Sequence, residues 1–262
     1  MNQTPPAQQT VQLNSPPGYG ALAPLDREKH RGLGLRPQRS YAWCARLNSM
    51  FVNAVELPRA GLDFPVAFVR EQNSGEFFPV AVLGLRAQEN LFVDARGQWK
   101  PHVYIPAYAR RHPFCIAEVP AAAGEEPKRL ICVQEDQLEV SAVPLFDAKG
   151  EATAAWAPVQ QLVEAMEGAR QQTRAFVRRL EAFGLFTPFD ALALPKGGQH
   201  LRLQGLHRVD EQKLQELGTK ELKLLQRKGE LRAVYAHLLS LEHFAKLLNL
   251  TQSLTAADGR RA

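Results

Sequence analysis

The sequence predicts an α+β fold in which an antiparallel sheet in the N-terminal half packs against C-terminal helices. Between Tyr41 and Val143 the apolar residues occur in short runs interrupted by Pro and Gly, and most runs are rich in Val, Ile, Phe or Tyr, as strands are. Beyond residue 155 the apolar residues recur instead at steps of three and four, which is the period of an amphipathic helix. Strands followed by helices along one chain are typical of the α+β class.

Six apolar runs in the first half have the length of a strand and are too short for a buried helix. They span residues 64–69, 78–85, 90–94, 102–108, 114–119 and 130–134. Polar residues at 88–90 and 94–97 supply turn chemistry, and Gly97 can adopt a positive φ. Short turns between successive strands predict antiparallel pairing.

A long amphipathic helix is predicted over residues 159–183, with Gly184 in the position where helices commonly end. A further strand is predicted at 201–209, directly before Asp210, whose side chain is suited to cap a helix. Three more helical segments follow, and they span 210–217, 220–228 and 231–250.

We expect a single domain over residues 25–250. Residues 1–24 contain two Pro pairs and few large apolar side chains, so they are predicted to form a flexible arm. Residues 251–262 lose the helical period and are predicted to be a disordered tail. A chain of 262 residues with 45% hydrophobic residues can bury a sizeable core, so it needs neither disulfides nor a structural metal.

The three cysteines are odd in number, widely separated and without a CxxC pair. This argues against a disulfide framework and a zinc site, and we expect no metal and no cofactor. Residues 1–20 lack the basic start and apolar run of a signal peptide, and no run is long enough to cross a bilayer. We therefore predict a soluble, cytoplasmic protein, while surface association by a non-classical export route stays open.

The formal net charge of +5 reflects 32 basic and 27 acidic residues spread over the chain. No zinc finger, RGG tract or ribonucleoprotein motif accompanies the basic residues, which disfavours nucleic acid as a partner. The chain has no GxSxG elbow and no phosphate-binding glycine loop. His237 and His243 are six residues apart, which places their rings on different faces of a helix rather than in a metal pair.

The first candidate binding site is a polar cluster in a loop punctuated by glycine, and it consists of Asp26, Arg27, Lys29, His30 and Arg31. Acid, base and cations within six residues can bind a substrate anion or form an acid/base pair. A solvated loop held by one Asp–Arg pair explains the same residues. Both interpretations stay open.

The second candidate binding site follows a predicted strand and consists of Tyr104, Tyr108, Arg110, Arg111 and His112. Two tyrosines and paired arginines can hold a carboxylate, a phosphate or a peptide backbone. Packing explains them equally. In a regular strand, Tyr104 and Tyr108 share a face, whereas Arg110 and Arg111 point to opposite sides.

Five sequence blocks are spread in order across the chain. They read PLDREKHRGLGLRP at 24–37, ENLFVDARGQW at 89–99, YIPAYARRHPF at 104–114, GLHRVDEQKLQEL at 205–217 and YAHLLSLEHFAKL at 235–247. Together they resemble the bacterial SapC family, which is distinct from the peptide-transport permease that shares the name. The resemblance implies an association with bacterial surface-layer gene clusters, and it implies no catalytic residue.

These observations predict a non-catalytic binding or accessory protein in a surface-layer or envelope-related pathway, with a protein, a peptide or an envelope component as its partner. The alternative is a cytoplasmic enzyme acting on a small molecule or peptide through a site assembled from Asp26, Lys29, His30, Tyr108 and Arg111. Convergence of both clusters in one concave pocket would favour the enzyme, and a scattered arrangement would favour binding. The sequence does not specify the oligomeric state.

Overall fold

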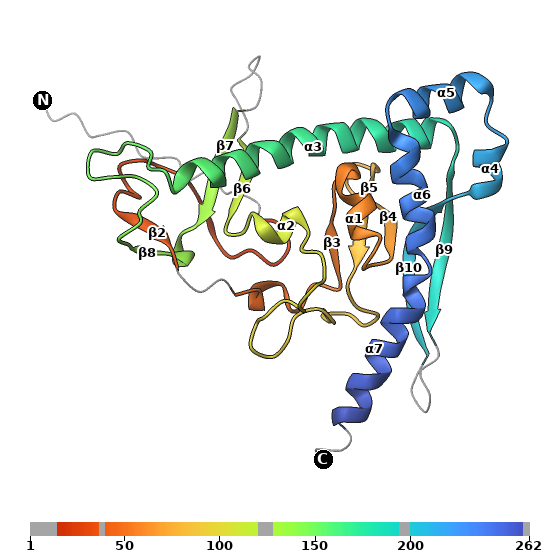
Figure 1. Ribbon diagram of the computed structural model, residues 1–262, viewed down its shortest axis with the longest axis horizontal. Coiled ribbons are helices and arrows are strands. Elements are labelled where there is room, and N and C mark those ends of the chain that lie inside the picture. Colours follow the sequence, from red (N-terminus) through yellow and green to blue (C-terminus); the bar gives the residue numbers. More distant parts are fainter. Residues whose placement is uncertain (1–14, 37–39, 120–127, 194–199, 259–262) are drawn as a thin grey trace, which may run out of the picture. The chain divides into compact units, whose positions relative to one another are not determined.

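The computed structural model describes residues 15–36, 40–119, 128–193 and 200–258. They form two compact units (Figure 1). Unit 1 comprises the described residues of segments 1–37 and 113–163, and unit 2 comprises those of segments 38–112 and 164–262. The prediction of one domain over 25–250 stays a prediction. The predicted arm and tail are folded in part, because residues 22–24 form a paired strand and residues 251–258 belong to a helix. Residues 1–14 and 259–262 lie outside the described residues.

Unit 1 is built on two small antiparallel sheets. Its three-stranded sheet has the order β1 (Leu22–Pro24), β7 (Lys128–Gln134), β6 (Phe114–Val119), and β2 (Leu33–Leu35) pairs with β8 (Leu138–Val140). A 3₁₀ turn, η3 (Glu135–Gln137), connects β7 to β8. The core comprises Phe114, Val133, Leu138, Leu145, Phe146, Trp156 and Val163.

Unit 2 contains a five-stranded antiparallel sheet with the order β3-β5-β4-β10-β9. Its strands are β3 (Ser49–Phe51), β4 (Val66–Arg70), β5 (Phe77–Val82), β9 (Phe186–Ala193) and β10 (Leu201–Val209). The α+β class and the antiparallel pairing are therefore confirmed. The C-terminal strand β10 pairs with β4, so this sheet combines both halves of the chain. Strand β9 was not predicted.

The helices follow the predicted order in the second half of the chain. The longest is α3 (Trp156–Ala182), and Gly184 beyond it has a φ of 66°. Asp210 caps α4 by accepting hydrogen bonds from the backbone N–H groups of Gln212 and Lys213. The predicted segment 231–250 divides into two helices. The bounds are α4 (Glu211–Gln215), α5 (Thr219–Arg227), α6 (Glu230–Ser240) and α7 (His243–Asp258).

Helix α6 runs beside β4 and β10 and is hydrogen-bonded to them through buried side chains (Figure 1). His237 Nδ1 lies 2.9 Å from the Val66 carbonyl, and its Nε2 accepts a hydrogen bond of 3.0 Å from the Val209 N–H. Ser240 Oγ accepts from the Val66 N–H at 2.9 Å. Burial lowers the pKa of His237 to about 4, so the ring is neutral at pH 7, and its Nδ1–H donates to Val66.

Two predicted strands are wrong, because proline and local side-chain bonds direct the chain elsewhere. In segment 90–94 the Asn90 Oδ1 accepts from the Phe92 N–H, and its Nδ2 donates to the Cys44 carbonyl. In segment 102–108 Pro106 is the N-cap of a short helix, α2 (Ala107–Arg110). Proline cannot donate to a strand ladder but suits the start of a helix, so the expected strand alternation of Tyr104, Tyr108, Arg110 and Arg111 does not occur.

Candidate functional site

The first predicted cluster lies in unit 1, in the turns between β1 and β2. Asp26 Oδ1 accepts hydrogen bonds from the backbone N–H groups of Glu28, at 2.8 Å, and Lys29, at 2.7 Å. The bond from Lys29 contributes most to a lowered pKa of Asp26. Arg31 pairs with Glu28, and Arg27 is exposed, with no ion pair to another described residue. Asp26 therefore shapes the turn instead of pairing with an arginine.

His30 is the buried member of this cluster, with 1% of its surface exposed. Its Nε2 lies 2.8 Å from Oε1 of Glu135. A carboxylate oxygen only accepts, so Nε2 carries the hydrogen. Lys29 reaches the same Glu135 oxygen, and its hydrogen bond, with that from His30, lowers the pKa of Glu135. Glu135 was not among the predicted site residues, because 105 residues separate it from His30.

The second predicted cluster lies in unit 2 and is organised around a buried carboxylate, Glu56, which is 6% exposed. Glu56 Oε1 accepts from the Tyr104 hydroxyl at 2.8 Å and from the Ala107 N–H at 2.7 Å. Its Oε2 accepts from the N–H of Asn53 at 2.9 Å and from the Asn53 side chain at 3.1 Å. Burial, followed by the Glu56 charge, raises the pKa of Tyr104 to about 12. These four hydrogen bonds satisfy the carboxylate within the fold.

The other members of the second cluster stack on aromatic rings. The Arg110 guanidinium carbon lies 5.9 Å from the Tyr104 ring centroid, and that of Arg111 lies 4.8 Å from the Tyr108 centroid. His112 stacks on Trp43 with 4.2 Å between ring centroids. Glu56 was not among the predicted site residues, although Asn53 and Glu56 have the three-residue spacing of a capping box.

The structure brings together the members of each cluster, and the two clusters belong to different units. Their use as binding surfaces stays a prediction. Two of the buried thiols are poor nucleophiles, because burial raises the pKa of Cys44 to about 12 and that of Cys132 to about 11. Among the described residues, no three His, Cys, Asp or Glu side chains are grouped to hold a metal ion.

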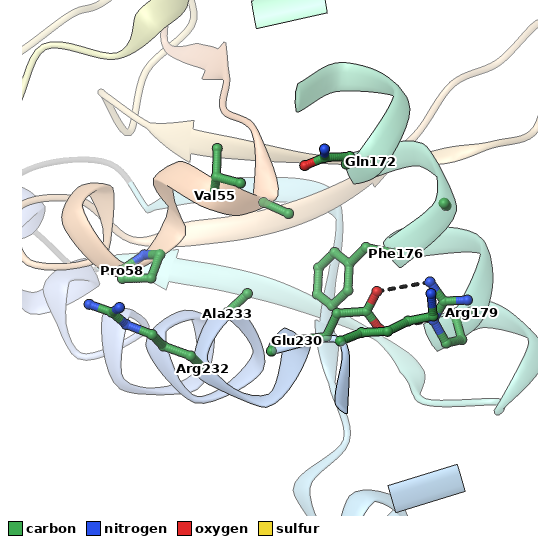
Figure 2. A pocket seen from close by; sticks show the side chains of 12 residues that line it. Val55, Pro58, Gln172, Phe176, Arg179, Glu230, Arg232 and Ala233 are labelled. Carbon is green, nitrogen blue, oxygen red and sulfur yellow. Dashed lines mark hydrogen bonds and ion pairs between the residues drawn. The ribbon is translucent and has the colours of Figure 1, made fainter. Parts of the chain in front are cut away.

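A groove that the sequence did not predict lies in unit 2 between the short helices η2 (Ala54–Glu56) and α1 (Leu57–Ala60), helix α3 and the start of α6. We call it the α3–α6 groove, and its volume is about 600 Å³. Figure 2 shows the side chains that converge on it. The lining residues are Ala54, Val55, Pro58, Gln172, Ala175, Phe176, Arg179, Lys228, Gly229, Glu230, Arg232 and Ala233.

The walls of the α3–α6 groove are held by specific contacts. Thr173 Oγ1 on α3 accepts from the Ala54 N–H at 2.8 Å, which joins η2 to α3. Gly229 has a φ of 70°, a conformation in which glycine is strongly favoured, and it allows the sharp turn from α5 to α6. Arg179 on α3 and Glu230 on α6 form two hydrogen bonds, each of 2.8 Å (Figure 2).

The charges around the α3–α6 groove are unbalanced. Its lining contains three cations, Arg179, Lys228 and Arg232, and one carboxylate, Glu230, a net charge of +2. Arg179 is paired with Glu230, which raises the Arg179 pKa. Lys228 and Arg232 are exposed and form no ion pair with any other residue that the structure describes. Two cations at the rim are therefore available to an external anion.

The comparison with known protein families identifies the family of this chain. The model of the SapC family matches residues 25–247, which is most of the chain. The chain belongs to the SapC family. No curated protein and no solved structure matches it. In this SapC-family protein the matched region includes both predicted clusters and the whole α3–α6 groove. No helix in the described ranges is long and apolar enough to span a membrane.

Proposed function

We propose that this SapC-family protein is a non-catalytic binding protein, which acts as an accessory in a surface-layer or envelope-related pathway. It binds a segment of a partner protein in the α3–α6 groove. The main support for this proposal is the groove itself. Its volume of about 600 Å³ lies within the range of about 300–1,000 Å³ that is usual for ligand sites. Its apolar floor is formed by elements that are joined by hydrogen bonds, so it is preorganised.

The surface beside the groove also supports docking. Ten large apolar side chains are exposed among the described residues, and four of them lie on or beside α1 and α6: Val55, Leu62, Tyr235 and Leu239. These elements pack closely, since a Cβ added to Gly61 would lie 2.9 Å from the Ala236 carbonyl oxygen of α6. Apolar side chains gathered on packed elements are typical of protein-binding surfaces.

The polar clusters favour binding over catalysis. His30 and Tyr104 use their side-chain polar atoms in hydrogen bonds within the fold, and Oδ1 of Asp26 accepts two backbone hydrogen bonds. A general base or acid needs a polar atom that faces the substrate. No arrangement of the described residues gives specific support to the enzyme alternative.

Site-directed photo-crosslinking tests the proposed function. A photoreactive residue replaces Val55, which lines the groove and is 62% exposed, or Val140 on β8, which is 87% exposed and outside it. We expect a discrete crosslinked partner in the source cells only from position 55.

A substitution that obstructs the groove tests the proposal further. The exposed Ala175 lines the groove, so Ala175→Trp should obstruct the groove and remove the crosslinked product. Gln171→Trp, at an exposed α3 position outside the lining, should not remove it. Equal products from positions 55 and 140, or a product insensitive to Ala175→Trp, would refute the proposal.

A further inference from the structure

We propose that the segment bound in the α3–α6 groove is an acidic peptide with a bulky apolar side chain, in which the carboxylates contact Lys228 and Arg232. The apolar side chain packs against Ala175, Phe176 and Ala233. This inference rests on the proposed function, because it names the chemistry of the segment that the groove binds.

The arrangement of charges selects an acidic partner. Glu230 is committed to Arg179, so the positive charges of Lys228 and Arg232 are not neutralised within the groove. A surface of one sign attracts a segment of the opposite sign and repels a basic one.

The amino end of α6 adds to the positive potential in the groove. The N-cap of this 11-residue helix is Gly229, which provides no side-chain acceptor. Glu230 in the first turn partly compensates the helix dipole, but its carboxylate is held by Arg179. The rim thus presents two exposed cations beside a helix amino terminus.

The floor of the groove selects an apolar side chain. Phe176 is 1% exposed and Ala233 is 6% exposed, and together with Ala54, Val55, Pro58 and Ala175 they form an apolar lining. Two small alanines, Ala175 on α3 and Ala233 on α6, line the groove and leave space for a large side chain of the partner. Such a pocket, bordered by charged residues, has the features of an interface hot spot.

The same features favour a peptide over a nucleic acid. Proteins that bind single-stranded nucleic acid stack the bases on accessible aromatic rings. Phe176 is the one aromatic residue in the lining, and it is buried. The apolar floor suits an aliphatic or aromatic side chain of a peptide instead.

Selection from a random peptide library against the full chain tests the inference. We expect the enriched peptides to be acidic and to contain a large apolar residue. The double variant Lys228→Gln with Arg232→Gln should bind the selected peptides at least about tenfold more weakly, because it loses charge-assisted contacts at a partly exposed site. The matched double variant Lys220→Gln with Lys223→Gln removes the same charge from α5, outside the lining, and should retain most of the affinity.

The outcomes separate this inference from the proposed function. If the selected peptides are neutral or basic and lose binding with Ala175→Trp but not with the Lys228 and Arg232 variant, the groove binds peptides and the acidic chemistry is wrong. If no selected peptide is sensitive to Ala175→Trp, both proposals fail. If a single-stranded oligonucleotide binds with the same dependence on Lys228 and Arg232 and displaces the peptides, the groove is a nucleic-acid site and the inference is overturned.

Discussion

His237 should make the stability of the fold depend on pH between pH 7 and 4. The pKa of this buried imidazole is lowered from 6.5 to about 4, chiefly by burial. The unfolded chain therefore binds a proton on His237 at a higher pH than the folded protein does, and the free energy of unfolding falls as the pH falls from 6.5 to about 4. Each pKa unit corresponds to about 1.4 kcal/mol. Keeping the ring neutral therefore contributes about 3 kcal/mol to the free energy of unfolding at pH 7, relative to low pH.

The geometry explains why protonation is opposed. Nε2 of His237 accepts from the Val209 N–H, and a protonated ring would place two donors opposite each other. The neighbouring Arg208 also lowers the pKa, whereas the hydrogen bond to the Val66 carbonyl raises it. Burial and the loss of the Val209 bond outweigh that one favourable contact.

Urea unfolding at a series of pH values measures this effect. His237→Gln should be less stable than the parent at pH 7, and the difference between them should narrow by about 3 kcal/mol as the pH falls to 4, because glutamine does not titrate. His243→Gln on α7, which replaces a half-buried histidine, is the matched control for the substitution itself. A difference between parent and His237→Gln that stays constant from pH 7 to 4 would refute the reasoning.

Two further predictions concern the local structure of unit 2. Glu56→Gln places an amide where Oε2 accepts two hydrogen bonds from Asn53, and it should destabilise the fold by about 1–3 kcal/mol. Glu71→Gln, at an exposed position, should not destabilise it. Equal melting temperatures for these two variants would contradict the buried role of Glu56. Gly229→Ala, at a φ of 70°, should destabilise by about 1 kcal/mol. Gly168→Ala, in the interior of α3 with open space around it, should stabilise the protein by about 0.5–1 kcal/mol. If calorimetry shows that both glycine variants change the free energy of unfolding in the same direction, the backbone argument is contradicted.

Local structure could be predicted where neighbouring residues determine it. The period of apolar residues located α3, Asp210 marked the start of α4, and Gly184 followed the end of the long helix. The prediction failed at residues 102–108, where the apolar pattern suggested a strand and Pro106 started a helix. It also failed at β9, whose residues Phe186–Ala193 include a proline and an aspartate, both of which are depleted in strands.

The site depended on contacts that no local pattern encodes. Glu135 joins His30 across 105 residues, and Glu56 joins Tyr104 across 48. The α3–α6 groove combines residues from segments 54–58, 172–179 and 228–233. In the sequence, Lys228 and Arg232 are ordinary solvated helix residues, and only the packing of α6 against α1 and the sheet places them at the rim of a groove.

Sequence patterns alone were sufficient to predict the α+β class, the order of most elements and the SapC family of this protein. Periodicity, capping and turn chemistry act between near neighbours in the chain, so they can be read without coordinates. Three features depend on the tertiary fold: β10 pairs with β4, a buried Glu56 organises the Tyr104 segment, and three distant segments enclose a basic groove with an apolar floor. These features arise when separate elements bury their apolar faces against one another, and that choice of partners depends on the whole core.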